Sequence, residues 1–491
     1  MQIDFLKIFF LLAIFFMLPN FASAANFPLE ITNIKPAGTG SPAIPAANRI
    51  FRAYPDIEYN IRAAVIGGVY PYTFSLSNAP SGMDISENGT ITWIPSSEIY
   101  NADPMTVESI ILTVTDFVGE QIQTTWSIEV TKGGFHFIDA SYVGLSIGDF
   151  EQPYKSASEM LQGLSDLSRN DIVYFRGGSY ILSQYGPDAG YVFMGGVQAG
   201  YYRPSAWLGY PNENVSIDNN KLIIRTDTLW LDNINFSNMD YYGFWLYGST
   251  GHYSAIRRSS FSGFTNSVAQ NNNQGIIYAS GGATSNRGYG LTVQDNEFSN
   301  YSDGQAIGSL YNGINTLIED NYIHDGGTYS VLAFCSPIGI KARNSYYAIR
   351  HNRVIMPGSA SNYDIYNELA QPDNAEFSYN YVLKSSGGNG KALVVFYPTN
   401  LYLYRNTIIG NVEFYPLLSA GPIAFNNNVL IGNLINGVNV TSLNNLIGSA
   451  DIVDVNGLLI NRSDVGIYGW ETANGSGDVI APSAPSGFLV M

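Results

Sequence analysis

A short pattern centred on asparagine recurs along the second half of the chain and limits what this chain can fold into. Each copy has an apolar residue, two variable residues, the asparagine, one more variable residue and a second apolar residue. Copies run from VQDNEF at 293–298 to FNNNVL at 425–430 and place asparagine at positions 296, 321, 352, 380, 406 and 428, with a weaker copy at Asn445. The pattern is fixed while the length of chain between copies varies. This combination predicts a solenoid in which each repeat is one coil and insertions map to loops.

The residues around the asparagines indicate coils built of strands. Apolar residues flank each asparagine closely, Gly, Asn and Ser separate the copies, and no long helical period appears. Asparagine tolerates left-handed backbone and bonds to turn amides, so we expect it at a bend, stacked on its counterparts in coils about 4.8 Å away. The pattern resembles the asparagine ladder of right-handed parallel β-helix proteins of the secreted, carbohydrate-active (pectate lyase-like) type. The resemblance covers residues 135–470 and implies the fold rather than an activity.

The start of the chain has the pattern of a secretory signal peptide over residues 1–24. An apolar run from Ile8 to Leu18 precedes Ala22-Ser23-Ala24, a small-residue cleavage site. The run is shorter than the roughly 20 residues that a membrane span needs. We therefore expect an exported mature chain with no membrane span, either secreted or held at a cell surface. Cys335 is the only cysteine, which excludes an internal disulfide and favours a bacterial extracellular protein.

Composition narrows the choice of partner. The net charge is −17 with only 23 Lys and Arg residues, which argues against nucleic acid or an anionic membrane. The chain has 35 Tyr, and aromatic faces with amide groups suit contact with sugars. We therefore predict a polysaccharide or glycoconjugate as the partner, and self-association stays open.

The first domain is predicted to be a β-sandwich over residues 25–132. Apolar residues alternate in YTFSL (72–76), TITWI (90–94) and TTWSIEV (124–130), between turns rich in Pro, Gly and Asn. These segments resemble the bacterial putative-Ig, cadherin-like repeats of secreted surface and carbohydrate-active proteins. Kinship with cadherins implies calcium as a candidate ligand, with oxygen ligands at Asp84, Glu87, Asp103 and Asp116. The alternative is that these carboxylates are solvated turn residues.

The second domain is expected over residues 133–470, after Lys132-Gly133-Gly134, with a Gly/Ser/Pro-rich tail at 471–491. Residues 156–168 have apolar side chains at helical spacing, with Ser158 placed to cap, so we expect a short helix over the open end of the first coil. Ile234 and Ser259 take the ladder position in the earlier coils.

Counting back from the ladder residue predicts which side chains meet on neighbouring strands. Glu319 and Arg350 stand two residues before their asparagines, and Asp320 and His351 stand one before. Each couple should therefore lie in register on adjacent strands and point outward. The simplest interpretation is a set of surface ion pairs, each stabilising the fold by under about 1 kcal/mol. The alternative is part of a catalytic constellation.

The chemistry of β-helix lyases gives a hypothesis for an active site. Abstraction of the C5 proton of a uronate needs a base and a cation that neutralises the adjacent carboxylate. Basic residues are scarce here, so those between 318 and 376 stand out. The hypothesis assigns catalysis to Lys341, Arg343 and His324, and substrate binding to Arg350, His351 and Asp325. A further acidic group offers a second candidate calcium site: Asp364, Glu368, Asp373 and Glu376.

Two functions remain open from the sequence. The first is an exported carbohydrate-active protein that binds, and as an enzyme would cleave, an acidic polysaccharide by β-elimination in the manner of a polysaccharide lyase. The second is a non-catalytic cell-surface adhesin or extracellular matrix protein with a sandwich spacer and a β-helix. The sequence lacks the paired aspartates and other signatures of the polygalacturonase kind, so hydrolysis is not expected.

Overall fold

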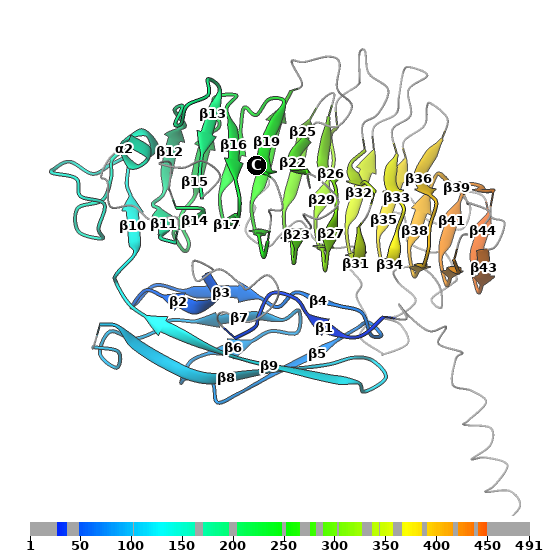
Figure 1. The fold of residues 1–491 in the computed structure, drawn as a ribbon, viewed down its shortest axis with the longest axis horizontal. Helices are drawn as coiled ribbons and strands as arrows, with labels where there is room; N and C mark the ends of the chain where they lie inside the picture. Colours follow the sequence, from blue (N-terminus) through cyan, green and yellow to red (C-terminus); the bar gives the residue numbers. More distant parts are fainter. Residues whose placement is uncertain are drawn as a thin grey trace, which may run out of the picture.

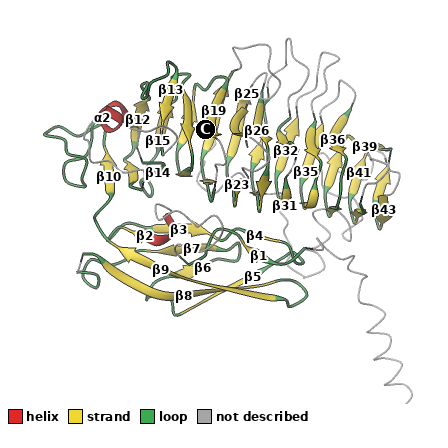
Figure 2. Cartoon of the chain, viewed as in Figure 1, coloured by secondary structure: helices red, strands yellow, loops and turns green. Residues whose placement is uncertain are grey.

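The computed structural model shows an all-β protein, in which a long parallel β-helix lies above a smaller antiparallel domain (Figure 1). Strands account for nearly all of the regular structure (Figure 2). The structure describes residues 27–36, 49–101, 103–162, 170–195, 204–247, 252–265, 275–280, 288–301, 304–326, 336–342, 344–356, 366–384, 390–415, 421–436 and 440–448. The predicted signal peptide and the predicted C-terminal tail lie outside these residues.

The β-helix has three parallel sheets, and successive strands of one coil belong to different sheets. Sheet 1 contains, in order, β10 (Phe135–Ile138), β11 (Ile172–Phe175), β14 (Ala206–Gly209), β17 (Trp230–Asp232), β20 (Ala255–Arg257), β24 (Thr292–Gln294), β28 (Leu317–Glu319), β31 (Ser345–Arg350), β34 (Asp373–Ser378), β37 (Leu401–Tyr404), β40 (Ile423–Asn426) and β43 (Val440–Leu443), with β23 (Gly288–Tyr289) and β27 (Gly313–Ile314) beside them. Sheet 2 contains β12 (Gly178–Ile181), β15 (Val215–Asp218), β18 (Asn235–Ser237), β21 (Ser260–Phe264), β25 (Glu297–Tyr301), β29 (Tyr322–Ile323), β32 (Arg353–Met356), β35 (Tyr381–Lys384), β38 (Thr407–Ile409), β41 (Val429–Ile431) and β44 (Leu446–Gly448). Sheet 3 contains β13 (Tyr191–Phe193), β16 (Ile223–Thr226), β19 (Tyr242–Tyr247), β22 (Gly275–Ser280), β26 (Gln305–Leu310), β30 (Ile338–Ile340), β33 (Asn367–Ala370), β36 (Lys391–Phe396), β39 (Asn411–Tyr415) and β42 (Leu434–Ile435).

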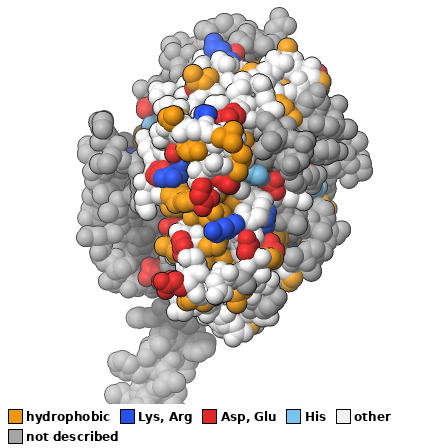
Figure 3. All heavy atoms as spheres, turned by 90° about the vertical axis from the view of Figure 1, so that its left-hand side faces the viewer, with side chains coloured by type: hydrophobic (Ala, Val, Ile, Leu, Met, Phe, Trp, Pro, Cys, Tyr) orange, Lys and Arg blue, Asp and Glu red, His pale blue; other side chains and the backbone are white. Residues whose placement is uncertain are grey.

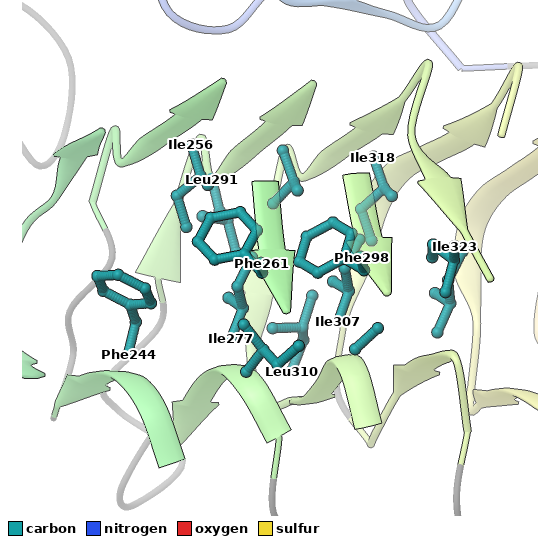
Figure 4. Close-up of a cluster of buried hydrophobic side chains, with 14 of the residues drawn as sticks. Phe244, Ile256, Phe261, Ile277, Leu291, Phe298, Ile307, Leu310, Ile318 and Ile323 are labelled. Carbon is teal, nitrogen blue, oxygen red and sulfur yellow. The ribbon is translucent and has the colours of Figure 1, made fainter. Parts of the chain in front are cut away.

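The interior of the β-helix is filled by apolar side chains that repeat from coil to coil. Phe236, Phe261 and Phe298 stack in one row, with ring centroids 5.8 Å and 4.9 Å apart. Isoleucines and leucines from the three sheets pack around them, as Figure 4 shows for the middle coils. The two apolar residues of each copy of the asparagine pattern thus face the core, as the sequence predicts.

The predicted asparagine ladder is confirmed. The side-chain oxygen of Asn352 accepts from the backbone N–H of Asn321 (3.1 Å) and from its side-chain amide (2.9 Å). The same pair of bonds links every consecutive couple from Asn296 to Asn445. Ser259 and Ile234 extend the column at its start, where the backbone N–H of Ile234 donates to the Ser259 hydroxyl (3.2 Å).

One detail of the bend differs from the expectation. The left-handed residue is the one before each asparagine: φ is 56° at both Asp320 and His351 and 53° at Tyr379 and Arg405. Asparagine supplies the hydrogen bonds, while its neighbour carries the backbone strain. Because left-handed backbone costs a side-chain-bearing residue roughly 1–2 kcal/mol, the ladder bonds must offset this cost in every coil.

A short helix, α2 (Ala157–Gln162), covers the first coil as predicted. Its Met160 and Leu161 are fully buried in the core of the β-helix. The cap is Ser156 rather than Ser158: the Ser156 hydroxyl accepts from the N–H of Glu159 (3.0 Å), and the Glu159 carboxylate accepts from the N–H of Lys155 (2.7 Å). Figure 3 looks onto this end of the molecule, where hydrophobic side chains are interspersed with acidic and basic ones.

The N-terminal domain is built of two sheets that share one core. One sheet has the order β2 (Arg52–Ala53), β9 (Gln121–Val130), β8 (Met105–Thr115) and β5 (Thr73–Ser77), and the other β3 (Tyr59–Arg62), β7 (Thr90–Trp93) and β6 (Asp84–Ile85). A short pair, β1 (Glu30–Ile31) with β4 (Val65–Ile66), and a 3₁₀ turn, η1 (Arg49–Phe51), complete it. Trp93 and Trp126 are buried between the sheets, as the predicted β-sandwich requires.

The sandwich lies lengthwise along the outer face of sheet 1 (Figure 1). Its core is continuous with outward-facing side chains of the β-helix, so one hydrophobic cluster contains Ile50 and Tyr54 together with Tyr174, Leu208 and Trp230. A second contact at the other end joins Ile66 and Ala64 to Leu317 and Ala348. This face of the β-helix is therefore an internal contact and not a free surface.

Candidate functional site

The Glu319–Arg350 pair lies in register on β28 and β31, as the sequence predicts, but it is not a surface pair. The Nε of Arg350 lies 2.6 Å from Glu319, and its side chain is 1% exposed. Arg350 also donates to the hydroxyl of Tyr72 (3.0 Å) and the carbonyl of Val65 (2.5 Å), both in the sandwich. The expectation of an exposed pair is wrong because the sequence does not reveal that the first domain covers sheet 1.

A second arginine enters the same cluster from the sandwich. Arg62, at the end of β3, contacts Asp295 (2.7 Å), Asp320 (2.5 Å) and Glu319 (3.1 Å) of the β-helix. Three carboxylates and two guanidinium groups therefore meet between the domains. We call Arg62, Asp295, Glu319, Asp320 and Arg350 the interdomain cluster.

Burial and charge divide the pKa values of this cluster. Burial alone would raise the pKa of Glu319, but Arg350 and Arg62 lower it to about 2. Burial raises the pKa of Asp320 to about 7, with Glu319 and Asp295 adding to the shift and Arg62 opposing it. The two pKa values move in opposite directions because Glu319 contacts both arginines, whereas Asp320 contacts Arg62. The cluster is an ionic contact that holds the two domains together.

His351 follows β31 at the position opposite Asp320, but the two side chains do not form the expected ion pair, because Asp320 pairs with Arg62. Its ring stacks on Tyr379, with centroids 5.1 Å apart, and contacts Tyr70 of the sandwich at 4.9 Å with the two planes tilted by 56°. Burial lowers its pKa to about 4, so the ring is neutral at neutral pH. Arg350 and His351, predicted to bind substrate, thus serve the contact between the domains.

His324 and Asp325 lie at the outer face of sheet 2, just after β29. The Nδ1 of His324 is 2.8 Å from Asp325 and its Nε2 is 2.8 Å from Glu297. Burial would lower the pKa of His324, but these two carboxylates raise it above the ordinary value. An imidazole held between two carboxylates favours its charged form, which is the wrong form for a base. Within the described residues, no hydrogen bond or ion pair joins His324 to Lys341.

Lys341 lies on a different face, directly after β30 of sheet 3. Its ammonium pairs with Glu368 of β33, and both side chains are 11% exposed. Tyr311, which follows β26, is half-buried, and the backbone N–H of Lys341 donates to the carbonyl of its neighbour Leu310 (2.9 Å). Burial raises the pKa of Tyr311, and Tyr278 and Glu368 raise it further, so its hydroxyl is uncharged at neutral pH. We call Lys341, Glu368 and Tyr311 the Lys341 centre.

Of the six predicted site residues, Arg343 lies outside the described residues. The other five are distributed over three faces: Lys341 on sheet 3, His324 and Asp325 on sheet 2, and Arg350 and His351 under the sandwich. Tyr311 and the role of Glu368 as the partner of Lys341 were not predicted. The register of sheet 3 pairs Glu368 with Gly339, two residues before Lys341, and the segments that join the ladder asparagines to β30 and β33 differ in length, so the ladder spacing does not reveal this pair.

The carboxylates considered as calcium ligands do not converge. Asp116 accepts from the backbone N–H groups of Val69, Val118 and Glu120 at 2.7–3.1 Å, which is the role of a turn residue. Glu376 is buried and accepts from the hydroxyl of Tyr404 at 2.9 Å. Asp364 lies outside the described residues. Within the described ranges, no group of three or more His, Cys, Asp and Glu side chains is placed to hold a metal ion.

In the part of the chain that the structure describes, no helix has the length and apolar character to cross a membrane. No protein-family model matches the sequence, and no curated protein matches it. Among solved structures, the chain is similar to a rhamnogalacturonan lyase, with a TM-score of 0.30 and 13% identity over 67% of this chain and 95% of that one.

Proposed function

We propose that this chain is an exported carbohydrate-active protein that binds an acidic polysaccharide on the outer face of sheet 3 and cleaves it by β-elimination at the Lys341 centre. The observation that carries the proposal is the pairing of Lys341 with Glu368 on sheet 3, where the backbone of Lys341 bonds to Leu310, the residue before Tyr311. This group lies on sheet 3, whereas the sandwich packs on sheet 1. A bound uronate would exchange its own carboxylate for that of Glu368 as the partner of Lys341.

The elimination breaks two bonds of the uronate and forms one double bond. The carboxylate of Glu368, released from Lys341 by the bound uronate, would take the C5 proton. The C4–O bond to the neighbouring sugar breaks with its electron pair going to the leaving oxygen, and a C4–C5 double bond remains in the product. Lys341 as an ammonium would neutralise the carboxylate and stabilise the enolate-like intermediate. Tyr311 would donate a proton to the leaving oxygen.

The test measures unsaturated uronate by its absorbance on alginate, pectate and glycosaminoglycans. Replacing Lys341 with Ala should abolish product formation, whereas Lys341→Arg should keep part of it if charge is what Lys341 supplies. Loss of activity in both variants would assign Lys341 the role of the base. An active parent whose rate survives Lys341→Ala would overturn the site. His324→Gln, on sheet 2, is the matched control and should leave the rate unchanged.

A second candidate function is a non-catalytic surface or matrix protein. It is favoured by one observation: the described Lys and Arg side chains that the sequence offered for the site already have carboxylate partners, as Lys341 has Glu368 and Arg350 has Glu319 (2.6 Å). In this case the parent protein forms no product on any glycan of the panel, and retention on an immobilised polysaccharide is the remaining activity.

A further inference from the structure

Six aromatic rings and one arginine lie together on the first half of sheet 3, where Phe193 and Tyr242 are buried and the others are part-exposed. The rings belong to Tyr191 and Phe193 of β13, Tyr241 and Tyr242 at the start of β19, Trp245 of β19, and Tyr278 of β22. Tyr242 and Tyr278 stack with centroids 4.3 Å apart and planes 24° apart, and Trp245 lies 5.4 Å from Tyr242 and 6.1 Å from Tyr278. We call Tyr191, Arg225, Tyr242, Trp245 and Tyr278 the aromatic platform.

The register of sheet 3 places the platform in line with the Lys341 centre. Phe193, Arg225, Trp245 and Tyr278 occupy one column of paired residues, and the column continues through Gly308 of β26. After an irregularity between β26 and β30, Gly339 pairs with Glu368. Gly308 and Gly339 therefore lie between the platform and the Lys341 centre, and the side chain of Gln305 packs over both. From β19 to β30 there are three strand spacings, or roughly 14 Å along the helix axis.

The chemistry of the platform differs from that of the Lys341 centre. Arg225 lies over the rings of Phe193 (5.3 Å) and Trp245 (4.9 Å), so its charge is spread against aromatic faces. Burial and the neighbouring phenols raise the pKa of Tyr242, which keeps its hydroxyl uncharged. Trp245 and Tyr278 are part-exposed. Such a surface offers ring faces for stacking and neutral hydroxyls for hydrogen bonds.

We infer that the aromatic platform is a sugar-binding surface that takes uncharged pyranose rings by stacking, and that it holds the neutral part of the polysaccharide whose uronate reaches Lys341. Only the second part of this inference, that the same polysaccharide brings a uronate to Lys341, rests on the proposed function. The apolar face of a pyranose ring packs on an aromatic ring without any charge on the sugar. Binding at the platform is therefore expected to be nearly independent of salt, in contrast to pairing of a uronate with Lys341.

The experiment titrates the full chain with xylohexaose and cellohexaose as neutral probes and hexagalacturonate as the acidic probe, using calorimetry. We expect at least one neutral probe to bind, with an affinity that changes less than about twofold between roughly 0.05 and 0.5 M salt. Trp245→Ala should weaken that binding by about tenfold or more, equivalent to the loss of one stacking contact. Trp245→Phe should recover part of it.

Two controls separate recognition from structure and from the proposed cleavage. Phe396→Ala removes another stacked pair of sheet 3, Phe396 with Tyr415 at 4.9 Å, and should leave neutral-probe binding unchanged. Lys341→Met should weaken only the acidic probe. If neither neutral probe binds, or if Trp245→Ala and Phe396→Ala weaken binding equally, the platform is structural and the inference fails. Binding of neutral probes with no response to hexagalacturonate would support the platform and count against the proposed function.

Discussion

At the scale of single residues, two adjacent positions have different roles at each ladder bend: one makes the hydrogen bonds and the other takes the left-handed backbone. Asn352 donates its side-chain amide to the carbonyls of Ile318 (3.0 Å) and Arg350 (2.9 Å), while its neighbour His351 takes the left-handed backbone. The asparagine position follows from the sequence because asparagine recurs there in every coil from Asn296 to Asn445. The neighbour varies freely, as Asp, His, Tyr and Arg, so no sequence pattern reveals its strain.

Replacing Asn352 with Leu is expected to lower the free energy of unfolding by roughly 1–3 kcal/mol, because buried carbonyls and the amide of Asn321 lose their partners. Denaturant unfolding measures the change. Asn433→Leu is the control, since its amide makes one exposed contact of 3.3 Å to Asn411 and its loss should cost little. Equal effects at the two positions would mean that the ladder bonds contribute no particular stability.

His351 makes stability depend on pH in a direction that can be derived. Its folded pKa of about 4 lies below its ordinary value, so the neutral form stabilises the folded state above about pH 6.5. This contribution is lost as the pH falls from about 6.5 towards 4. His351→Phe, which keeps an aromatic ring against Tyr379, should remove a pH-dependent loss on the order of 2 kcal/mol. Unfolding of both proteins at pH 7 and near pH 4.5 measures it.

Asp320 makes stability depend on pH in the opposite direction to His351. Because its folded pKa is raised to about 7, its contribution is present at low pH and is lost as the pH rises through 7. Asp320→Asn should therefore be more stable than the parent protein at pH 8 and nearly equal to it at pH 4. A variant that is less stable at pH 8 would show that the contact with Arg62 outweighs burial.

At the scale of elements, the sequence predicts the strands of the ladder region and the capping helix because both depend on local patterns. The helix prediction over 156–168 agrees with α2 where the structure describes it, and residues 163–169 lie outside the described part. Which face of each strand remains accessible depends on contacts between distant segments. For that reason the sequence could identify Lys341 as a candidate and could not recognise that Arg350 is covered.

The capping helix gives a prediction at this scale. Leu161→Ala should cost about 2–5 kcal/mol, because a fully buried leucine leaves a cavity at the end of the core. The exposed neighbour Gln162→Ala is the matched control and should be close to neutral. Thermal unfolding and light scattering together show whether the variant loses stability or also begins to associate through the first coil. Equal melting temperatures for the two variants would mean that α2 does not seal the core.

At the scale of the whole molecule, the interdomain cluster couples the sandwich to the β-helix. Arg62→Met leaves Asp295, Glu319 and Asp320 facing one arginine fewer, and breaking such a buried pair typically costs about 3–5 kcal/mol. We expect faster proteolysis near Lys132-Gly133-Gly134 and weaker docking, measured on the intact chain. Lys35→Met removes a part-exposed pair with Glu30 and should change little. Similar proteolysis of the two variants would assign docking to the hydrophobic contact alone.

The lengthwise position of the sandwich also changes how the coils respond to stress. In a solenoid without a second domain, each coil contacts only its neighbours, so the stack can unfold from either end one coil at a time. Here the sandwich reaches from Tyr174 of β11, which bonds to Arg49 at 3.1 Å, to Tyr379 after β34, whose ring lies 5.0 Å from Tyr70. Because the sandwich contacts all of these coils, we expect the coils between these two points to unfold as one cooperative unit. Among the described residues, the hydrogen bonds and ring contacts between the sandwich and the coils end at Tyr379, so the coils after β37 should exchange their amide hydrogens first.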